Sequence, residues 1–264
     1  MIAPGLCSIT FRSLTADDVI GVACRAGVEG IEWGADGHAP PGGGPTIAAL
    51  GARGRDAGLE VVSYGSYLGM APPDGTDDDA VDAVLETAVA LGSPMVRIWT
   101  EFGVTPTSAD AERRRVTERT AELVDRIAGH GLLTALEFHP ATLTETAASA
   151  TALIDALDRP GLRTHWQPDP ALSPAAALGE LSLVTPHLAH LHVFAWGPEG
   201  IDDRQALVDG EPLWAPALAL ADRDGAALPG RRYALCEYVR GDDPEQFAAD
   251  VRTLRRWLDP SENS

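Results

Sequence analysis

Short apolar runs alternate with longer amphipathic stretches from one end of the chain to the other. Apolar runs of about four to eight residues bounded by turn residues are typical of buried strands, whereas apolar positions recurring every three or four residues are typical of helices. The pattern predicts strands over residues 5–11, 30–33, 60–64, 95–99, 131–139, 162–167, 188–194 and 233–238. It predicts helices over residues 16–26, 45–57, 77–91, 109–130, 144–157, 174–184, 213–221 and 244–258.

This alternation predicts the fold class. Strands and helices that follow one another in turn form a parallel sheet covered by its own crossover helices, which is an α/β architecture. Eight such units close into a (β/α)8 TIM barrel of about 250 residues, and the chain has 264. No change in composition and no Ser/Pro-rich linker divides it. We therefore predict a single domain over residues 1–260, followed by a frayed tail at residues 261–264.

The formal charge of −19 opposes binding to nucleic acids and to anionic membranes, because both carry negative charge. The one basic run, residues 113–115, lies among glutamates in a predicted helix and indicates a solvated face. The N-terminus lacks a basic segment followed by a long apolar core, and no apolar run is long enough to span a membrane. The three cysteines show no disulfide or redox spacing and are predicted to be small buried residues. We expect a cytoplasmic protein.

Three predicted strands end in a residue that binds metals or transfers protons: Glu137, His192 and Glu237. A fourth ends in Gln167. The carboxyl ends of barrel strands meet at one mouth, where catalytic groups from several strands converge. A single residue of this kind is more often part of a structural salt bridge, but its repetition favours one shared site. Carboxylate, imidazole and amide donors suit Mn²⁺, Mg²⁺, Co²⁺ or Zn²⁺.

Further residues at or beyond strand ends are expected to line a pocket for the substrate. Strand alternation places His139 on the face of Glu137, and His165 on the face of Gln167. The residues expected to contact substrate are Glu32, His38, Tyr64, Trp99, His139 and His165. Structural roles compete with this interpretation: a hydrogen bond for Glu32, a surface position for His38 and core packing for Trp99. Arg97 is predicted to point inward, either in a buried ion pair or as a substrate clamp.

With these motifs, the sequence resembles the sugar phosphate isomerase/epimerase family of xylose isomerase-like TIM barrels, which includes ketose 3-epimerases, inosose dehydratases and endonuclease IV. The resemblance covers nearly the whole chain. The motifs that carry it are Gly30-Ile31-Glu32-Trp33, Leu136-Glu137-Phe138-His139, His190-Leu191-His192-Val193-Phe194, Arg204…Leu207…Gly210…Trp214, and Leu235-Cys236-Glu237-Tyr238 with Asp243-Pro244-Glu245.

The resemblance implies roles for four residues. Glu137 and Glu237 match the glutamates that bind a divalent metal and act as acid and base, and His192 matches a histidine ligand. Arg204 resembles the arginine that holds substrate oxygens. A divalent ion holding a hydroxyketone would acidify its α-carbon proton, and the two glutamates would move that proton through an enediolate.

The sixth strand departs from the family pattern. Relatives usually carry Asp followed three residues later by His, where this chain has Gln167 and Pro170. Glutamine binds metals through its amide oxygen but brings no charge, so a weaker or different metal preference follows. His165 and Asp169 are the other ligands considered for this strand. Because the missing histidine helps epimerases to bind sugar hydroxyls, the substrate stays open.

Several functions share this predicted site. The leading hypothesis is an isomerase or epimerase of a sugar or sugar-like hydroxyketone. The alternatives are a metal-dependent lyase (an inosose or dehydroshikimate type of dehydratase, or a deglycosidase subunit) and a non-catalytic barrel with a degenerate site. An endonuclease-like hydrolase is disfavoured by seven histidines and the charge of −19. We expect a small carbohydrate or polyol as the binding partner, with no nucleic acid or membrane, and pairing of two copies through the rims of their mouths.

Overall fold

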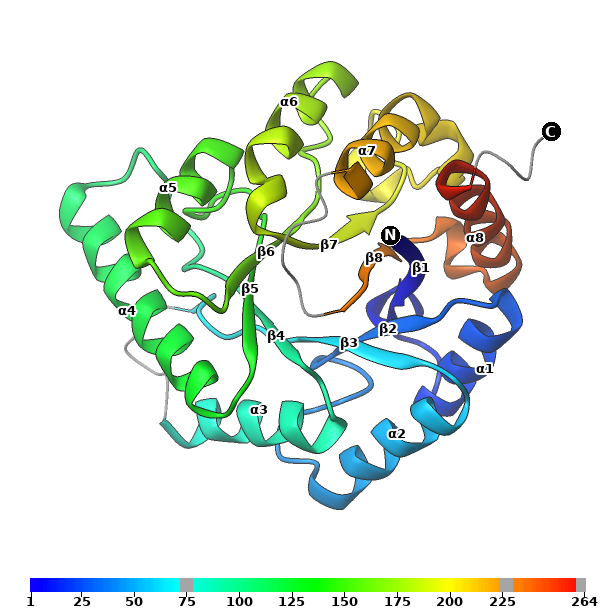
Figure 1. The fold of residues 1–264 in the computed structure, drawn as a ribbon, viewed down its shortest axis with the longest axis horizontal. Coiled ribbons are helices and arrows are strands. Elements are labelled where there is room, and N and C mark those ends of the chain that lie inside the picture. The colour runs from blue at the N-terminus through cyan, green and yellow to red at the C-terminus, as the bar shows by residue number, and fades with distance from the viewer. Residues whose placement is uncertain (72–77, 224–229, 260–264) are drawn as a thin grey trace.

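The computed structural model describes residues 1–71, 78–223 and 230–259, and in these ranges the chain forms a closed barrel of eight parallel strands ringed by helices (Figure 1). The strands are β1 (Ile2–Cys7), β2 (Gly30–Gly34), β3 (Glu60–Gly65), β4 (Met95–Ile98), β5 (Leu133–Glu137), β6 (Leu162–Trp166), β7 (Leu188–Val193) and β8 (Arg232–Cys236). The helices are α1 (Ala16–Ala26), α2 (Gly44–Asp56), α3 (Asp78–Leu91), α4 (Asp110–Gly129), α5 (Ala147–Leu157), α6 (Pro174–Val184), α7 (Glu211–Arg223) and α8 (Pro244–Leu258). The strands follow sequence order around the ring, and β8 pairs with β1 to close it. The predicted single-domain (β/α)8 barrel is confirmed.

Local signals account for the helix ends. Thr15 caps α1 by accepting a hydrogen bond from the Asp18 amide, and Gly27 ends the same helix in a left-handed conformation at φ 75°. Ser173 caps α6 in the same way as Thr15, with Pro174 in its first turn. None of the helices in the described ranges is long and apolar enough to cross a membrane. The predicted tail at 261–264 lies outside the described residues.

Two predicted boundaries were wrong for physical reasons. The first strand was predicted over residues 5–11, but β1 ends at Cys7 and a 3₁₀ turn follows over Ser8–Phe11. Ser8 turns the chain there, because its hydroxyl accepts a hydrogen bond from the Gly34 amide at 2.9 Å. The helix predicted from residue 144 begins at Ala147, because the Thr144 hydroxyl instead donates to the carbonyl of Glu137 at 2.6 Å.

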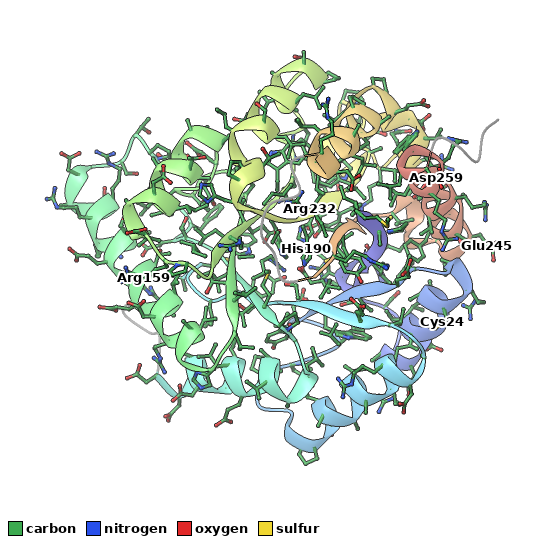
Figure 2. All side chains as sticks on the ribbon, in the orientation of Figure 1. Cys24, Arg159, His190, Arg232, Glu245 and Asp259 are labelled. Atoms are coloured by element: carbon green, nitrogen blue, oxygen red, sulfur yellow. The ribbon has the colours of Figure 1, made fainter. Side chains whose placement is uncertain are left out.

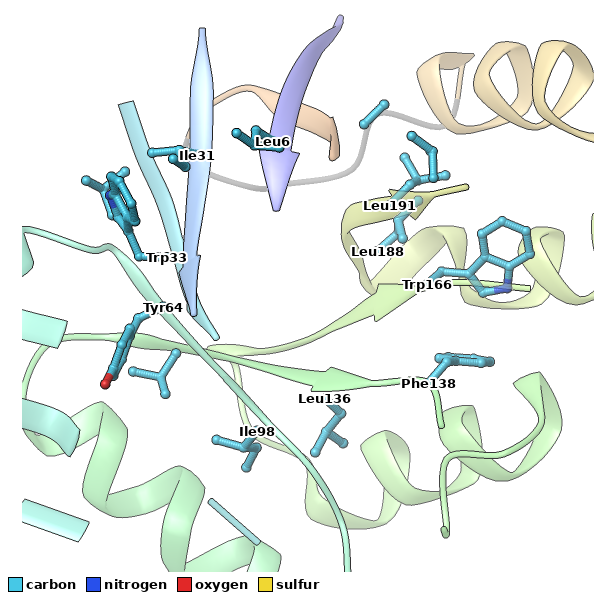
Figure 3. Packing of buried hydrophobic residues seen from close by; sticks show 14 of the residues in the cluster. Leu6, Ile31, Trp33, Tyr64, Ile98, Leu136, Phe138, Trp166, Leu188 and Leu191 are labelled. Carbon is cyan, nitrogen blue, oxygen red and sulfur yellow. The ribbon is translucent and has the colours of Figure 1, made fainter. Parts of the chain in front are cut away.

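Strand alternation separates two layers of packing. The outward side chains, among them Leu6, Ile31, Trp33, Leu136 and Trp166, pack between the barrel and the helices (Figure 3). The inward side chains form smaller groups, and one of these joins Met95, Ala135 and Ala189. Two residues further along β4 and β5, the same inner face presents Arg97 and Glu137. The polar site is therefore supported on an apolar layer inside the barrel.

The ladder between β6 and β7 is interrupted close to the site. Thr164 pairs with Leu188, yet the next residue, His165, pairs with His190, so β7 contributes one extra residue, Ala189. Ala189 packs inside the barrel and Leu191 packs outside it. His190 contacts the inward-facing rings of His165 and Tyr233. A similar shift lies between β2 and β3, where Glu32 pairs with Ser63. Such irregularities redirect side chains and are common beside active sites.

Candidate active site

Five ionisable side chains meet inside the barrel, and each lies on, or directly after, a different strand. Glu32 of β2, Arg97 of β4 and His192 of β7 are at most 3 % exposed, and Glu237, directly after β8, is also 3 % exposed. Glu137, the last residue of β5, lies beside them and is buried too. Figure 2 shows His190 and Arg232 toward the barrel centre. It shows other charged residues at the outer edge of the molecule: Arg159, Glu245 and Asp259.

His192 occupies the middle of this group. Its Nδ1 atom lies 3.3 Å from Glu137 Oε1 and 3.4 Å from Glu237 Oε2. On the opposite side of the ring, Nε2 lies 3.4 Å from Glu32 Oε1. The imidazole therefore separates a pair of carboxylates, Glu137 and Glu237, from the deeper carboxylate of Glu32.

Arg97 joins two of the carboxylates. Its Nε atom lies 3.1 Å from Glu32 Oε1, and the same guanidinium pairs with the Glu137 carboxylate. Gly65 provides the necessary space, because a Cβ atom there would lie 2.5 Å from Arg97 Nη2 and 2.9 Å from Glu32 Oε1. Of the two roles considered for Arg97, the buried ion pair is present, and the residue also lines the cavity above.

The charges perturb one another strongly. Burial opposes ionisation, but the charge of Arg97 and contacts with His192 lower the pKa of both Glu32 and Glu137. Burial, with repulsion from Glu137, raises the pKa of Glu237 to about 7. Burial disfavours the charged form of His192, yet the carboxylates of Glu237 and Glu32 raise its pKa well above the usual value. In the absence of a metal ion, protons therefore compensate part of the negative charge.

These residues fit a divalent cation. Glu137, His192 and Glu237 each offer a donor atom, and these atoms lie within 4.8 Å of one another. Within the described part of the chain, both ring nitrogens of His192 and Glu237 Oε2 are buried without a hydrogen bond. With neutral histidines, the three carboxylates and the Arg97 guanidinium leave two uncompensated negative charges. Oxygen and imidazole donors together suit divalent ions.

Three residues were considered as the sixth-strand ligand, and the structure places them differently. Gln167 lines the cavity and donates its amide Nε2 to the Phe138 carbonyl at 2.7 Å, which leaves its Oε1 as the ligand atom to be tested. Asp169 lies at the exposed rim and accepts a hydrogen bond from the Ala171 amide. His165 is fully buried, with its Nδ1 3.2 Å from Glu32 Oε2.

A cavity of about 590 Å³ opens above the charged group. Three charged residues of the buried group also line this cavity: Arg97, Glu137 and Glu237. The aromatic residues that line it are Tyr67, Trp99, Phe138, Phe194, Trp196 and Tyr238. A buried polar group below an apolar opening is the usual composition of a small-molecule site.

The predicted substrate residues fall into three sets: at the cavity, below it and away from it. Trp99 and His139 both line the cavity, with ring centres 3.9 Å apart. Arg204 lies beside the cavity, paired with Asp242 at 2.6 Å and 5.1 Å from the ring centre of Tyr238. Glu32 and His165 lie below the cavity, in the buried group rather than along the cavity wall.

Tyr64 and His38 are not brought to the cavity. The Tyr64 ring packs between the barrel and the helices, and its hydroxyl donates to the Ala39 carbonyl at 2.8 Å. It faces outward because the β2–β3 register shifts just before it. His38 is buried beside Ser8 Oγ at 3.2 Å and the Leu14 carbonyl at 3.1 Å, so its imidazole holds the turn after β1.

Cys7 was missed as a member of the buried group. Its Sγ lies 3.4 Å from Glu32 Oε1. A correct end for the first strand would have revealed it, since Cys7 is the last residue of β1 and points inward. Cys236 is buried in the outer layer, as expected, but Cys24 is exposed, contrary to expectation.

The closed barrel, the buried group of donor atoms and the cavity above it are typical of TIM-barrel proteins whose site lies at the carboxyl ends of the strands. The sequence model of the xylose isomerase-like TIM barrel family matches residues 20–257, and the chain belongs to this family. No curated protein sequence matches the chain significantly.

Three solved structures illustrate the similarity. The probable 3-DHS dehydratase AsbF of Bacillus anthracis has a TM-score of 0.79 and 18% identity, covering 96% of this chain and 99% of its own. D-allulose 3-epimerase from Methylomonas sp. has a TM-score of 0.72 and 14% identity, and the match covers 97% of this chain and 98% of the epimerase. A Mycobacterium smegmatis xylose isomerase-like TIM barrel protein in complex with magnesium has a TM-score of 0.67 and 15% identity, and the match covers 98% of this chain and 97% of the other. At these identities, the similarity shows the fold.

Proposed function

We propose that this protein is a divalent-metal-dependent isomerase or epimerase of a sugar-like hydroxyketone. The observation that carries the proposal is the convergence of Glu137, His192 and Glu237 donors within 4.8 Å, with both glutamates lining a cavity of about 590 Å³. Family membership and the names of the 3-epimerase neighbours support it. Glu137, His192 and Glu237 would hold the ion, with Gln167 as the fourth ligand.

A bound divalent ion would polarise the substrate carbonyl and offset the negative charge that develops when an α-proton leaves. The residues of the chain divide the remaining work. Glu137 and Glu237 take and return the proton, because both carboxylates reach the cavity from separate strands. Arg97 keeps Glu137 oriented and ionised through their ion pair. The aromatic rim limits the access of water.

A lyase remains the second candidate, because the same residues would remove a proton next to a β-hydroxyl that then leaves as water. The 3-DHS dehydratase among the structural neighbours favours testing it. Candidate ketoses and inososes should be incubated with the metal-loaded protein. Epimers that retain all their oxygens support the isomerase, whereas a dehydrated product that absorbs ultraviolet light supports the lyase.

The proposal is tested by elemental analysis of the purified protein together with Glu137→Gln and Glu237→Gln variants. We expect near-stoichiometric Mn, Co, Zn or Mg in the parent protein, and folded variants that have lost turnover. His192→Ala should lose the metal. A parent protein that takes up no divalent ion after reconstitution would instead indicate a non-catalytic barrel. Light scattering of the same sample tests the expected homodimer.

A further inference from the structure

Aromatic side chains line the cavity on two sides. Tyr67 follows β3, and Trp99 follows β4. Trp196 follows β7, and Tyr238 follows β8. In a closed ring of eight strands in sequence order, β3 and β7 are four strands apart, as are β4 and β8, so each pair lies on opposite sides of the mouth. The cavity is therefore a slot between two aromatic walls.

The first wall consists of Tyr67, Trp99 and His139, and we call it the Trp99 wall. Its ring centres are 6.0 Å apart for Tyr67 and Trp99, and 3.9 Å apart for Trp99 and His139. Gly69 fixes the backbone behind it, since a Cβ there would lie 2.0 Å from the Trp99 carbonyl and its φ is +87°. The Trp99 wall is thus held in place by the fold before any ligand binds.

The second wall consists of Phe194, Trp196 and Tyr238, and we call it the Trp196 wall. Phe194 and Trp196 are stacked, with ring centres 4.3 Å apart and an angle of 26° between planes. The Trp196 and Tyr238 rings meet edge to face at 5.4 Å. The buried Trp214 holds the wall from behind by donating its indole N–H to the Phe194 carbonyl at 2.7 Å. Both walls therefore present preformed ring surfaces, which stack well on flat apolar groups.

The charges around the cavity disfavour an anionic substrate. Among the described residues that line it, the cations are Arg12 and Arg97. Arg97 is paired with buried carboxylates, and Arg12 Nε is paired with Asp36 at 2.7 Å. The acidic residues that line the cavity are Glu137, Glu145, Asp169 and Glu237. Apart from a divalent ion held as proposed above, a phosphate or carboxylate group would meet carboxylates and already paired arginines, so the lining side chains would not compensate its desolvation.

We propose that the substrate is an uncharged polyhydroxy ketone or aldehyde that carries a planar aromatic group. Its hydroxyls and carbonyl lie against Glu137 and Glu237, and its ring lies between the Trp99 wall and the Trp196 wall. The cavity of about 590 Å³ lies within the range of roughly 300–1,000 Å³ for sites that enclose drug-sized ligands. A free ketose would leave much of the slot to water. This inference rests on the proposed function and adds the substrate class to it.

Binding of a matched pair of probes tests the substrate class. Methyl β-D-glucopyranoside and phenyl β-D-glucopyranoside share the sugar and differ in the aglycone, which is a methyl group in one and an aromatic ring in the other. Shikimate and D-fructose 6-phosphate serve as anionic probes. The Mn²⁺-loaded protein is titrated with each, by calorimetry and by tryptophan fluorescence. We expect the phenyl glucoside to bind at least tenfold more tightly than the methyl glucoside, and more tightly than either anion. Stacking needs only the aromatic ring, so the test does not depend on the stereochemistry of the true sugar.

Variants assign the effect to the walls. Trp99→Ala and Trp196→Ala should each reduce the preference for the phenyl glucoside while leaving Mn²⁺ uptake unchanged. Trp257→Ala, in α8 and away from the cavity, is the matched control and should retain the preference.

Equal binding of the two glucosides, binding of neither, tighter binding of an anion, or an unchanged preference in both wall variants would overturn the substrate class. If Mn²⁺ still binds in those cases, the proposed function stands. If the parent protein takes up no divalent ion, the proposed function fails, and the substrate class fails with it.

Discussion

Replacing Arg97 with methionine should destabilise the metal-free protein severely. Arg97 is 3 % exposed and pairs with the buried carboxylates of Glu32 and Glu137. Methionine keeps part of the apolar stem but removes the charge, so both carboxylates lose their counter-charge inside the barrel. Removing one partner of a buried ion pair costs about 3–5 kcal/mol. At about 2–4 °C per kcal/mol for a large domain, the melting temperature should fall by about 6–20 °C.

Acid and metal should both reduce this loss. Arg97 lowers the pKa of Glu32 and Glu137, so its stabilisation is present above the ordinary pKa of a glutamate and disappears as the pH falls through the lowered values. A divalent cation replaces part of the missing positive charge and binds only the folded state. The difference between variant and parent should therefore be largest in EDTA near neutral pH, and smaller with Mn²⁺ or in acid.

Calorimetric melting in EDTA and in Mn²⁺, at several pH values, measures the effect. Arg113→Met is the matched control, because Arg113 forms an exposed pair with Asp110 that contributes at most about 1 kcal/mol. If metal-free Arg97→Met melts as close to the parent as the control does, then the buried carboxylates do not depend on this cation, and the charge balance described for the site is wrong.

Three further predictions follow from the same group of residues. Glu32→Gln should weaken Mn²⁺ binding about 10–100-fold in calorimetric titrations, because Glu32 orients the ligand His192 from behind; unchanged affinity would leave Glu32 a purely structural role. Gln167→Asp should strengthen Mn²⁺ binding about tenfold by adding a charged ligand, and an unchanged or lower affinity would remove residue 167 from the ligand set. His190 is buried, its Nδ1 accepts the Tyr233 N–H at 3.1 Å, and burial holds its pKa well below 6.5. The contribution of His190 to the free energy of unfolding is therefore complete above about pH 6.5 and is lost as the pH falls below that. His190→Gln should flatten the pH dependence of urea unfolding between about pH 7 and 5. Parallel curves for variant and parent would show that His190 does not titrate on unfolding.

The fold was predictable because every βα unit carries its own pattern of apolar positions and end signals, and consecutive units are neighbours in the ring. The convergence of Glu137, His192 and Glu237 was predictable for a related reason, since the carboxyl ends of parallel barrel strands share one mouth. The family match supports both points without testing the individual residues.

Side-chain direction near the site was harder to predict. Alternation places Tyr64 correctly only if the β2–β3 register is known, and nothing in the local sequence marks the shift between these strands. The buried partners of Arg97 depend on distances across the barrel, which no local pattern encodes. Ser8, which ends β1, could have been read as a strand residue or a turn residue, and Cys7 was overlooked for that reason.

The extra residue in β7 has a consequence for how this chain tolerates insertions and deletions. Because alternate side chains face opposite sides, losing Ala189 would make the pairing with β6 regular and leave His192 facing inward. Losing Leu191 instead, which lies beyond the irregularity, would turn His192 outward, with Val193 in its place. Such a protein would keep its barrel and nearly all of its composition, yet the metal-binding set would be broken. Relatives that vary freely in the length of their loops should therefore keep the number of residues between this irregularity and the end of the strand constant, and a sequence alignment that places a gap there would misassign the site.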